Sequence, residues 1–287
     1  SCGPRTLRLK QITIIGLGLI GGSLAAACRR KFPRARIVGV SRNRGALAKG
    51  KKKGWIHEGT TDLAQGLRRT NFVILCTPVD TLKGLLRQID RFARPGTLVT
   101  DTGSVKGFLV RWAERQRWRN IHFVGAHPMA GSHERGIESA KPDLFKNALT
   151  FITPGRGAPR RAPAVQTVIN FWNKISPRFA VVSPEEHDWI ASEVSHFPHL
   201  LAALLVTSVS SKSLRFAASG FLDTTRVAEG DPGIWLPILK ENRKELFRSL
   251  ADFEVRLQDV KRILKRGDFS RLRCLLTQGQ IRRRSLE

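Results

Sequence analysis

The sequence is poor in the residues that build disulfide frameworks, membrane spans and secretion signals. Its 287 residues contain no Tyr. The four cysteines are Cys2, Cys28, Cys76 and Cys274, which are widely separated and form no Cys-x-x-Cys motif. This spacing favours free thiols in a reducing compartment over disulfides or a zinc site. No run of about 18 apolar residues is present, and the N-terminal segment lacks the apolar core of a signal peptide. We therefore expect a cytoplasmic protein without a membrane span.

Acidic residues are also scarce. Lys and Arg total 50 against 23 Asp and Glu, which gives a net charge of +27, and segment 29–53 carries 11 basic residues and no acidic one. A surface of this kind binds nucleic acid through phosphate contacts, attracts small anions towards a cleft, or is only solvated. The charge alone leaves these three interpretations open.

What is present is an alternation of short apolar runs and helix-like segments, in a chain that is 41% hydrophobic and so able to form a core. The runs are rich in β-branched residues: 12–16 (ITIIG), 36–40 (RIVGV), 72–76 (FVILC), 97–101 (TLVTD) and 122–126 (HFVGA). Continuous apolar runs separated by helices are typical of a doubly wound, mostly parallel sheet covered on both faces. We expect the runs at 149–153 and 178–182 to extend the same sheet. The fold class is therefore α/β.

Helical signals dominate from Ser183 onwards. Ser183 is a predicted helix N-cap, Pro184 takes the first helical position, and acidic residues follow in the first turn. We therefore predict an all-helical C-terminal domain over residues 183–287. Its segment 238–264 has apolar positions at helical spacing, which serve either a dimer interface or an intrachain core.

A glycine-rich turn follows the first predicted strand and opens a helix. It reads Gly16-Leu17-Gly18-Leu19-Ile20-Gly21, the spacing of a dinucleotide-binding turn in the context that this motif requires. Gly16 permits the tight turn, Gly18 lets the backbone approach a pyrophosphate, and Gly21 allows close packing of helix on strand. Backbone N–H groups at the helix start then face the phosphates. Together with Thr77 and Pro78, these residues form the predicted cofactor site of a Rossmann-like domain, residues 1–182.

Ser41, Arg42 and Asn43 follow the second predicted strand, about 20 residues after the glycines, where the choice between NAD and NADP is made. A carboxylate at this position would bind the 2′-hydroxyl of NAD and repel a 2′-phosphate. A hydroxyl and a planar guanidinium instead suit a phosphate monoester. We therefore predict NADP as the cofactor. NAD remains the alternative if Arg42 is only an exposed loop residue.

Several further motifs occur in a fixed order between about residues 11 and 250. They are GLGLIGGS, TDTGSVK, GAHPMAGS, KPDLFKNA, SPEEHD, SHFPHLLA and GFLDTTRVAEGDPGIW. In this order they resemble the prephenate/arogenate dehydrogenases of tyrosine biosynthesis. The resemblance implies an NADP-dependent oxidative decarboxylation of prephenate, arogenate or both. In this reaction a hydride passes from the ring carbinol carbon to the nicotinamide, the ring carboxylate leaves as CO₂, and the ring becomes aromatic. Members usually dimerise through the helical domain, so the resemblance also implies a homodimer with a dicarboxylate substrate.

The resemblance assigns roles to individual side chains. His127 of GAHPMAGS corresponds to the catalytic histidine, which takes the hydroxyl proton as a neutral imidazole, so activity should fall as it protonates. Ser104 would bind the same hydroxyl. His199 would face the substrate, and Arg226 would bind a substrate carboxylate through its guanidinium fork. We expect no mutase domain before residue 11 and no regulatory domain after residue 287, so any inhibition by tyrosine would act at the active site.

The pair His196 and His199 also has the spacing of two metal ligands on a helix. Hydride transfer to nicotinamide needs no metal, so we expect none, and we expect a structural hydrogen bond at His196. Pro198 should free the carbonyl of Val194 and kink the helix. In the alternative interpretation both histidines are hydrogen-bonded core residues.

Two other functions remain as alternatives. Another Rossmann 3-hydroxyacid or imine reductase would explain the glycine motif and the helical domain, but not HPMAG together with SHFPH. A nucleic-acid-binding protein on the same scaffold would explain the basic segment 29–53. The sequence, however, lacks the interleaved aromatic residues and the nucleic-acid motifs that such a protein would need. We therefore expect no specific nucleic-acid partner.

Overall fold

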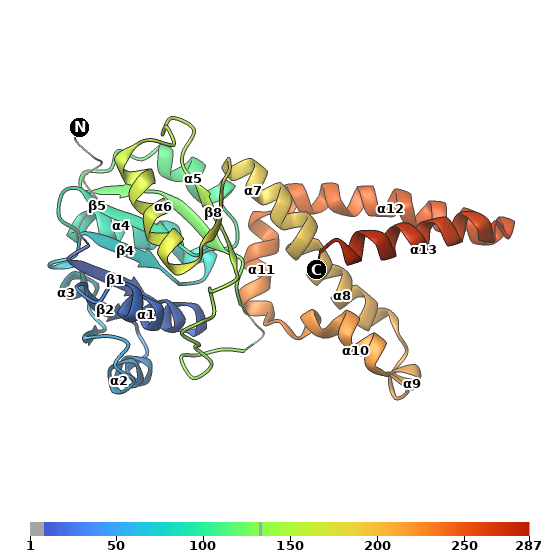
Figure 1. Ribbon diagram of the computed structural model, residues 1–287, viewed down its shortest axis with the longest axis horizontal. Helices are drawn as coiled ribbons and strands as arrows, with labels where there is room; N and C mark the ends of the chain where they lie inside the picture. The colour runs from blue at the N-terminus through green and yellow to red at the C-terminus, as the bar shows by residue number, and fades with distance from the viewer. Residues whose placement is uncertain (1–8, 132–133, 287) are drawn as a thin grey trace. The chain divides into compact units, whose positions relative to one another are not determined.

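The computed structural model describes residues 9–131 and 134–286. In these residues a parallel six-stranded sheet has the order β3-β2-β1-β4-β5-β6 (Figure 1). Its strands are β1 (Gln11–Ile15), β2 (Arg36–Val40), β3 (Glu58–Thr60), β4 (Phe72–Leu75), β5 (Thr97–Asp101) and β6 (Ile121–Phe123). The chain leaves β1 towards β2 and later returns to its other side as β4, so the strand order reverses between β1 and β4. Ligands of doubly wound sheets bind at the carboxyl ends of the strands beside such a point.

Helices cover both faces of this sheet, which is why its central strands β1, β4 and β5 are buried at every position. They are α1 (Leu19–Lys31), α2 (Arg44–Lys52), α3 (Leu63–Leu67), η1 (Val79–Thr81), α4 (Leu82–Phe92), α5 (Gly107–Glu114) and α6 (Pro163–Ile175). Leu24 of α1 and Trp172 of α6 belong to the core on one face. Leu86 of α4 and Leu109 of α5 belong to the core on the other face. The predicted α/β class is confirmed.

The prediction that runs 149–153 and 178–182 extend the large sheet is wrong. They form β8 (Leu149–Thr153) and β9 (Arg178–Val181), in a separate sheet of order β7-β8-β9. The predicted strand 122–126 divides at Val124 into β6 and β7 (Gly125–Pro128). Because β7 pairs antiparallel with β8, its edge is no longer free to continue the parallel sheet. The sequence also missed β3, which is only three residues long and has no apolar run.

The segment after β9 is helical in the described residues, as predicted. Its elements are α7 (Pro184–Ala191), η2 (Ser192–His196), α8 (Phe197–Ser208), α9 (Ser211–Leu214), α10 (Ser219–Thr225), η3 (Arg226–Glu229), α11 (Pro232–Glu241), α12 (Arg243–Arg266) and α13 (Phe269–Arg284). Element η2 is a π-helical turn in which the Phe197 N–H donates to the Ser192 carbonyl. It lies just before Pro198, which has no N–H to continue the α-helical ladder.

The chain forms two compact units, Ser1–Asn242 and Arg243–Glu287. The first unit continues past the boundary predicted at residue 182, because α7 packs against α5, and α11 packs against η1. The boundary itself stays a prediction. The second unit contains α12 and α13, which pack against each other. Segment 238–264 is therefore not one helix, because α11 ends before Asn242.

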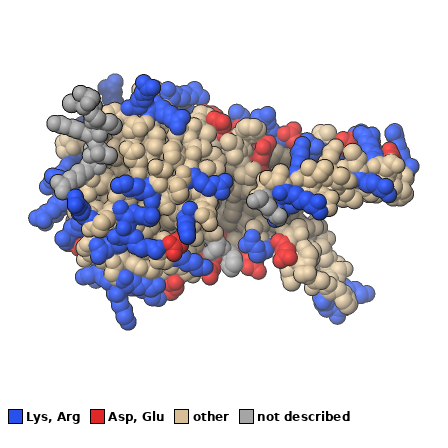
Figure 2. Space-filling model, viewed as in Figure 1, with Lys and Arg blue, Asp and Glu red and all other residues tan. Residues whose placement is uncertain are grey.

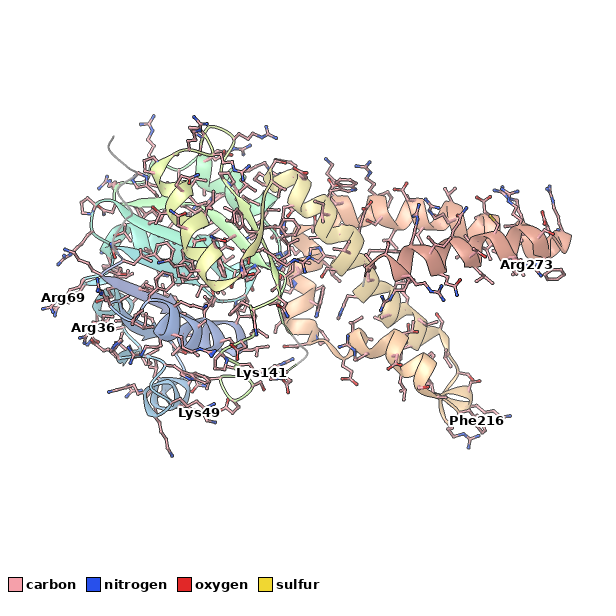
Figure 3. All side chains as sticks on the ribbon, viewed as in Figure 1. Arg36, Lys49, Arg69, Lys141, Phe216 and Arg273 are labelled. Atoms are coloured by element: carbon pink, nitrogen blue, oxygen red, sulfur yellow. The ribbon has the colours of Figure 1, made fainter. Side chains whose placement is uncertain are left out.

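Apolar side chains are exposed on several helices of this chain. Phe216 after α9 is 79% exposed (Figure 3), and Leu204 of α8 and Leu236 of α11 are also exposed. The stretch Pro184–Ser208 is, within the described residues, long and apolar enough to cross a membrane by length and composition alone. One face of it carries buried His187, Asp188 and His196. A mixed surface of this kind suits packing against protein.

Candidate active site

The glycine turn between β1 and α1 has the geometry that the motif predicts. Gly16 has φ of +94°, and a Cβ on it would lie 2.5 Å from the Cys76 carbonyl oxygen. A Cβ on Gly21 would overlap the Gly16 carbonyl oxygen, so both positions require glycine. A Cβ on Gly18 would instead meet nothing within 4 Å. The backbone at Gly18 is thus open to a ligand.

The start of α1 offers donors for phosphates. No side chain caps this helix and its first turn carries no acidic residue, so its first N–H groups are available to an anion. Leu17 and Leu19 are buried, so these two residues can face a cofactor only through the backbone, whereas Ile20 is partly buried against the core. These features fit a dinucleotide.

Thr77 and Pro78 lie beside the glycine turn. A Cβ on Gly16 would be 2.8 Å from Thr77 Cγ2. The Thr77 hydroxyl is 2.7 Å from the Thr81 hydroxyl, which donates to the Pro78 carbonyl. These bonds hold the loop after β4 against the turn, as expected at the switch point between β1 and β4.

The loop after β2 presents a guanidinium and a hydroxyl at the selector position. The Ser41 hydroxyl oxygen accepts the Asn43 N–H at 3.2 Å, and the Asn43 side-chain oxygen caps α2 by accepting the Ala46 N–H at 3.0 Å. Arg42 is exposed, and its guanidinium forms no ion pair with any residue that the structure describes. Ser41 and Asn43 therefore order the loop while Arg42 stays available to an anion. Figure 2 shows further Lys and Arg side chains across the visible face of the sheet-containing unit, and Arg36, Lys49 and Arg69 lie at its surface (Figure 3).

A buried ion pair lies at the carboxyl end of β5. Lys106 and Asp101 are both fully buried and their charged groups are in contact. The Lys106 ammonium also donates to the Ala126 carbonyl at 2.9 Å, and the Ala126 N–H donates to Asp101 at 3.1 Å. Burial lowers the pKa of Lys106, although Asp101 opposes this shift. Through these bonds the ion pair fixes the residue that precedes His127.

His127 is in contact with a second histidine and, through it, with a carboxylate. Its Nδ1 lies 2.9 Å from His187 Nε2, and His187 Nδ1 lies 2.8 Å from Asp188 Oδ1. The two carboxylate oxygens of Asp188 accept the backbone N–H groups of Lys106 and Gly107, at 2.7 and 2.8 Å. His127 is 7% exposed and His187 is completely buried. The three side chains thus form one continuous row.

Burial keeps these imidazoles uncharged. It lowers the pKa of His127 well below the usual 6.5, and the neighbouring His187 and Lys106 lower this pKa further. The pKa of His187 is also well below its usual value, mainly through burial. Burial raises the pKa of Asp188, against the opposing effect of the two backbone N–H groups and Lys106. His127 is therefore neutral at physiological pH, as a proton acceptor must be.

The two histidines of SHFPH have different surroundings. His196 Nδ1 lies 2.9 Å from the Asn242 side-chain nitrogen, which also donates to the Asp188 carbonyl at 2.8 Å. His199 stacks on Trp235, with ring centroids 3.6 Å apart, and its buried Nδ1 has no hydrogen-bond partner in the described residues. His196 thus bonds to Asn242 through Nδ1. Each ring keeps one buried nitrogen without a hydrogen-bond partner in the described residues, Nε2 in His196 and Nδ1 in His199.

Ser104 and Arg226 lie on separate segments of the first unit. Ser104 is half-buried in the loop between β5 and α5, and its backbone influences the pKa of His196. Arg226 is exposed and begins η3, which packs against α8. A Cβ on Gly230, just after η3, would lie 2.6 Å from His199. Element η3 therefore adjoins the helix that carries His199, while Arg226 itself remains at the surface of this chain.

Sequence reasoning missed His187, Asp188, Lys106, Asp101 and Asn242. His187 and Asp188 stand in the motif SPEEHD, which we used as a helix start and as a family motif without assigning a role to either residue. The signal that could have found them is a His-Asp pair in the first turns of a helix with a clear N-cap residue. Ser183 accepts the Glu186 N–H at 3.0 Å and so sets the register that turns His187 and Asp188 inward.

The chain matches two models of known protein domains. Residues 24–181 match the model of the prephenate dehydrogenase nucleotide-binding domain. Residues 183–278 match the model of the prephenate dehydrogenase dimerization domain. The chain belongs to the prephenate dehydrogenase family.

Individual relatives of the family support the same assignment. The chain is 35% identical over 271 residues to a prephenate dehydrogenase of Bacillus subtilis, covering 91% of this chain and 72% of the relative. It is 30% identical over 261 residues to a cyclohexadienyl dehydrogenase of Zymomonas mobilis, covering 88% and 87% of the two chains.

Solved structures of the family have the same fold. A prephenate dehydrogenase from Aquifex aeolicus, in complex with hydroxyphenyl propionate and NAD⁺, has a TM-score of 0.90 at 29% identity and covers 99% of this chain and 100% of its own. The Synechocystis arogenate dehydrogenase has a TM-score of 0.80 at 28% identity and covers 96% and 100% of the two chains. This member of the prephenate dehydrogenase family is thus an oxidoreductase of aromatic amino acid biosynthesis with a nicotinamide dinucleotide cofactor.

Proposed function

We propose that the protein oxidises and decarboxylates prephenate, arogenate or both, with NADP⁺ as the preferred cofactor. The observation that carries this proposal is the buried, neutral His127 at the carboxyl edge of the sheet. Hydrogen bonds link the strand ends along that edge, because Cys76 donates to Ile15 at 2.8 Å and Thr102 donates to Leu75 at 3.0 Å. His127 is joined to the same edge through Ala126 and Asp101.

The glycine turn and the start of α1 would hold the cofactor, whose nicotinamide would supply the hydride acceptor for the ring carbinol carbon. His127 accepts the hydroxyl proton as the carbonyl forms, and Ser104 holds the hydroxyl in register. The bond to the ring carboxylate then breaks to release CO₂, and its electron pair enters the ring, which becomes an aromatic phenolate. The proton held by His127 returns to this oxygen to give the phenol. Since aromatisation is strongly favourable, the protein's task is to orient the substrate and accept the proton.

Two further side chains are proposed to bind the substrate. Arg226 would hold a carboxylate, because its guanidinium fork matches a carboxylate bidentately. His199 would face the substrate side chain, which its unsatisfied Nδ1 supports. Prephenate carries a keto group where arogenate carries an ammonium, and the proposal covers either substrate or both.

The proposal of NADP⁺ rests on the selector loop. Arg42 is exposed there, and the sequence places no carboxylate between Ser41 and Arg44 that would repel a 2′-phosphate. The alternative is NAD⁺, which was bound in the Aquifex aeolicus relative.

We also propose that the protein is a homodimer. The match to a dimerization domain over residues 183–278 supports this. So do the exposed apolar side chains of several helices: Leu204, Leu222, Leu236, Phe247 and Leu276.

The reduction of NADP⁺ and of NAD⁺, followed by absorbance with prephenate and with arogenate, tests the function. We expect turnover with at least one substrate, at least about tenfold higher kcat/KM for NADP⁺, and loss of that preference in Arg42→Ala. His127→Asn should lower kcat by on the order of 10²–10⁴-fold while leaving cofactor affinity intact. Lys51→Ala is the matched control, since this exposed cation on α2 lies outside the selector triplet. A clear preference of the native protein for NAD⁺ would refute the selector assignment, and full turnover in His127→Asn would refute the role of His127.

A further inference from the structure

A row of three buried side chains leads from a carboxylate to His127. His187 lies between them, with one ring nitrogen 2.8 Å from Asp188 and the other 2.9 Å from His127 Nδ1. The row joins two elements, because His127 is on β7 and the other two residues are on α7. The protonation of Asp188 fixes which nitrogen of His187 carries a proton, and this nitrogen in turn fixes the proton of His127.

That end is Asp188. Both of its oxygens accept backbone N–H groups at the start of α5, so both act as acceptors. Burial raises the pKa of Asp188, but these two N–H groups and the Lys106 ammonium oppose that shift and favour its charge. An ionised carboxylate has only acceptor atoms. His187 Nδ1, which faces it, must therefore carry the proton of that bond.

The remaining proton positions follow from the neutrality of both rings. A neutral imidazole has a single N–H, so His187 Nε2 is a lone pair and must accept. His127 Nδ1 must then donate to it, which leaves His127 Nε2 without a proton. We propose that His187 and Asp188 are positioning residues that hold His127 in the tautomer whose Nε2 accepts the substrate proton. This inference rests on the proposed role of His127.

The tautomer matters because the two forms have opposite capabilities at Nε2. With the proton on Nδ1, Nε2 can accept the hydroxyl proton. With the proton on Nε2, the ring can only donate to the hydroxyl, and proton transfer to it is blocked. In enzymes where a carboxylate sets the tautomer of a catalytic histidine, its loss costs up to about 10⁴-fold in kcat.

The pair His187→Gln and His187→Asn tests the proposal, because both introduce the same amide at different reach. The longer Gln places an oxygen near the former Nε2 and can accept from His127, whereas Asn ends near the former Nδ1 and cannot. We expect His187→Gln to keep kcat within about tenfold of the wild type, and His187→Asn to lose on the order of 10²–10⁴-fold. KM for the cofactor should not change in either variant, and thermal melting reports whether each one folds.

Nitrogen NMR of the wild-type imidazoles reads the tautomer without any turnover. The signal that disappears in His127→Asn identifies His127, and at mildly alkaline pH it should show a protonated Nδ1 and an unprotonated Nε2. In folded His187→Asn the same ring should shift towards the Nε2–H form. A wild-type His127 protonated at Nε2 would overturn the inference, as would equal loss of kcat in both variants with an unchanged tautomer. Absence of turnover with a correct tautomer would instead count against the proposed function alone.

Discussion

At the scale of single residues, the site consists of ionisable side chains that folding has removed from water. Lys106, Asp101, His187 and Asp188 are almost or fully buried. Burying such groups is costly unless each finds a partner. Here Lys106 pairs with Asp101, and the Asp188 carboxylate accepts two backbone N–H groups. The cost of desolvation is thus offset by bonds that also fix the position of His127.

Arg226 is a single side chain that we propose binds a carboxylate of the substrate. Replacing it with Lys should raise KM for the substrate by about tenfold or more, because an ammonium cannot reproduce the guanidinium fork. Steady-state kinetics with prephenate and arogenate measure this effect. Arg215→Lys, at an exposed position after α9, is the matched control and should change KM less than about twofold. An unchanged KM in Arg226→Lys would remove this residue from the site.

At the scale of elements, the β1–α1 turn contains two glycines with different roles, one needed for packing and one beside the proposed cofactor site. A Cβ on Gly21 would overlap the Gly16 carbonyl oxygen, whereas one on Gly18 would enter open space. Gly21→Ala should therefore lower the free energy of unfolding by about 1–3 kcal/mol through overpacking. Gly18→Ala should change it by less than about 0.5 kcal/mol, yet raise KM for the cofactor by on the order of tenfold, because the methyl group occupies space beside the phosphates.

Urea unfolding and cofactor titration of these two variants provide the measurements. Each variant is the control for the other, since both add one methyl group within the same turn. Should Gly18→Ala bind cofactor as well as the wild type, the open space at that glycine would not be the phosphate site.

At the scale of the whole molecule, the buried histidines connect stability to pH. Burial lowers the pKa of His196 to about 4, although Asp188 and the Ser104 backbone raise it and His199 lowers it. In the unfolded chain this ring titrates near its usual value of about 6.5. Between these values the unfolded state binds a proton that the folded state does not. Stability is therefore lost as the pH falls from about 6.5 to about 4.

This residue alone should cost roughly 3 kcal/mol across that range. His196→Asn retains an acceptor near the former Nδ1 for Asn242, and it should flatten the pH dependence of the free energy of unfolding by about that amount. Urea unfolding at several pH values between 7 and 4 measures the slope. His122→Asn, at an exposed position of β6, is the control and should leave the slope unchanged. An equally steep slope in His196→Asn would show that His196 does not contribute.

Four features of this protein could be predicted from its sequence: the α/β class, the glycine turn, the helical character after residue 182 and the family. All of these depend on local patterns, such as continuous apolar runs between helices and glycines where a Cβ would collide. The three-stranded sheet could not be predicted in this way. It exists because β7 pairs with β8 and does not continue the parallel sheet beside β6. The same holds for the partners of His127. His187 lies 60 residues further along the chain, and Asn242 lies 46 residues beyond His196. Contacts between such distant groups arise from packing of whole elements, and no local pattern of residues records which buried polar atoms will meet.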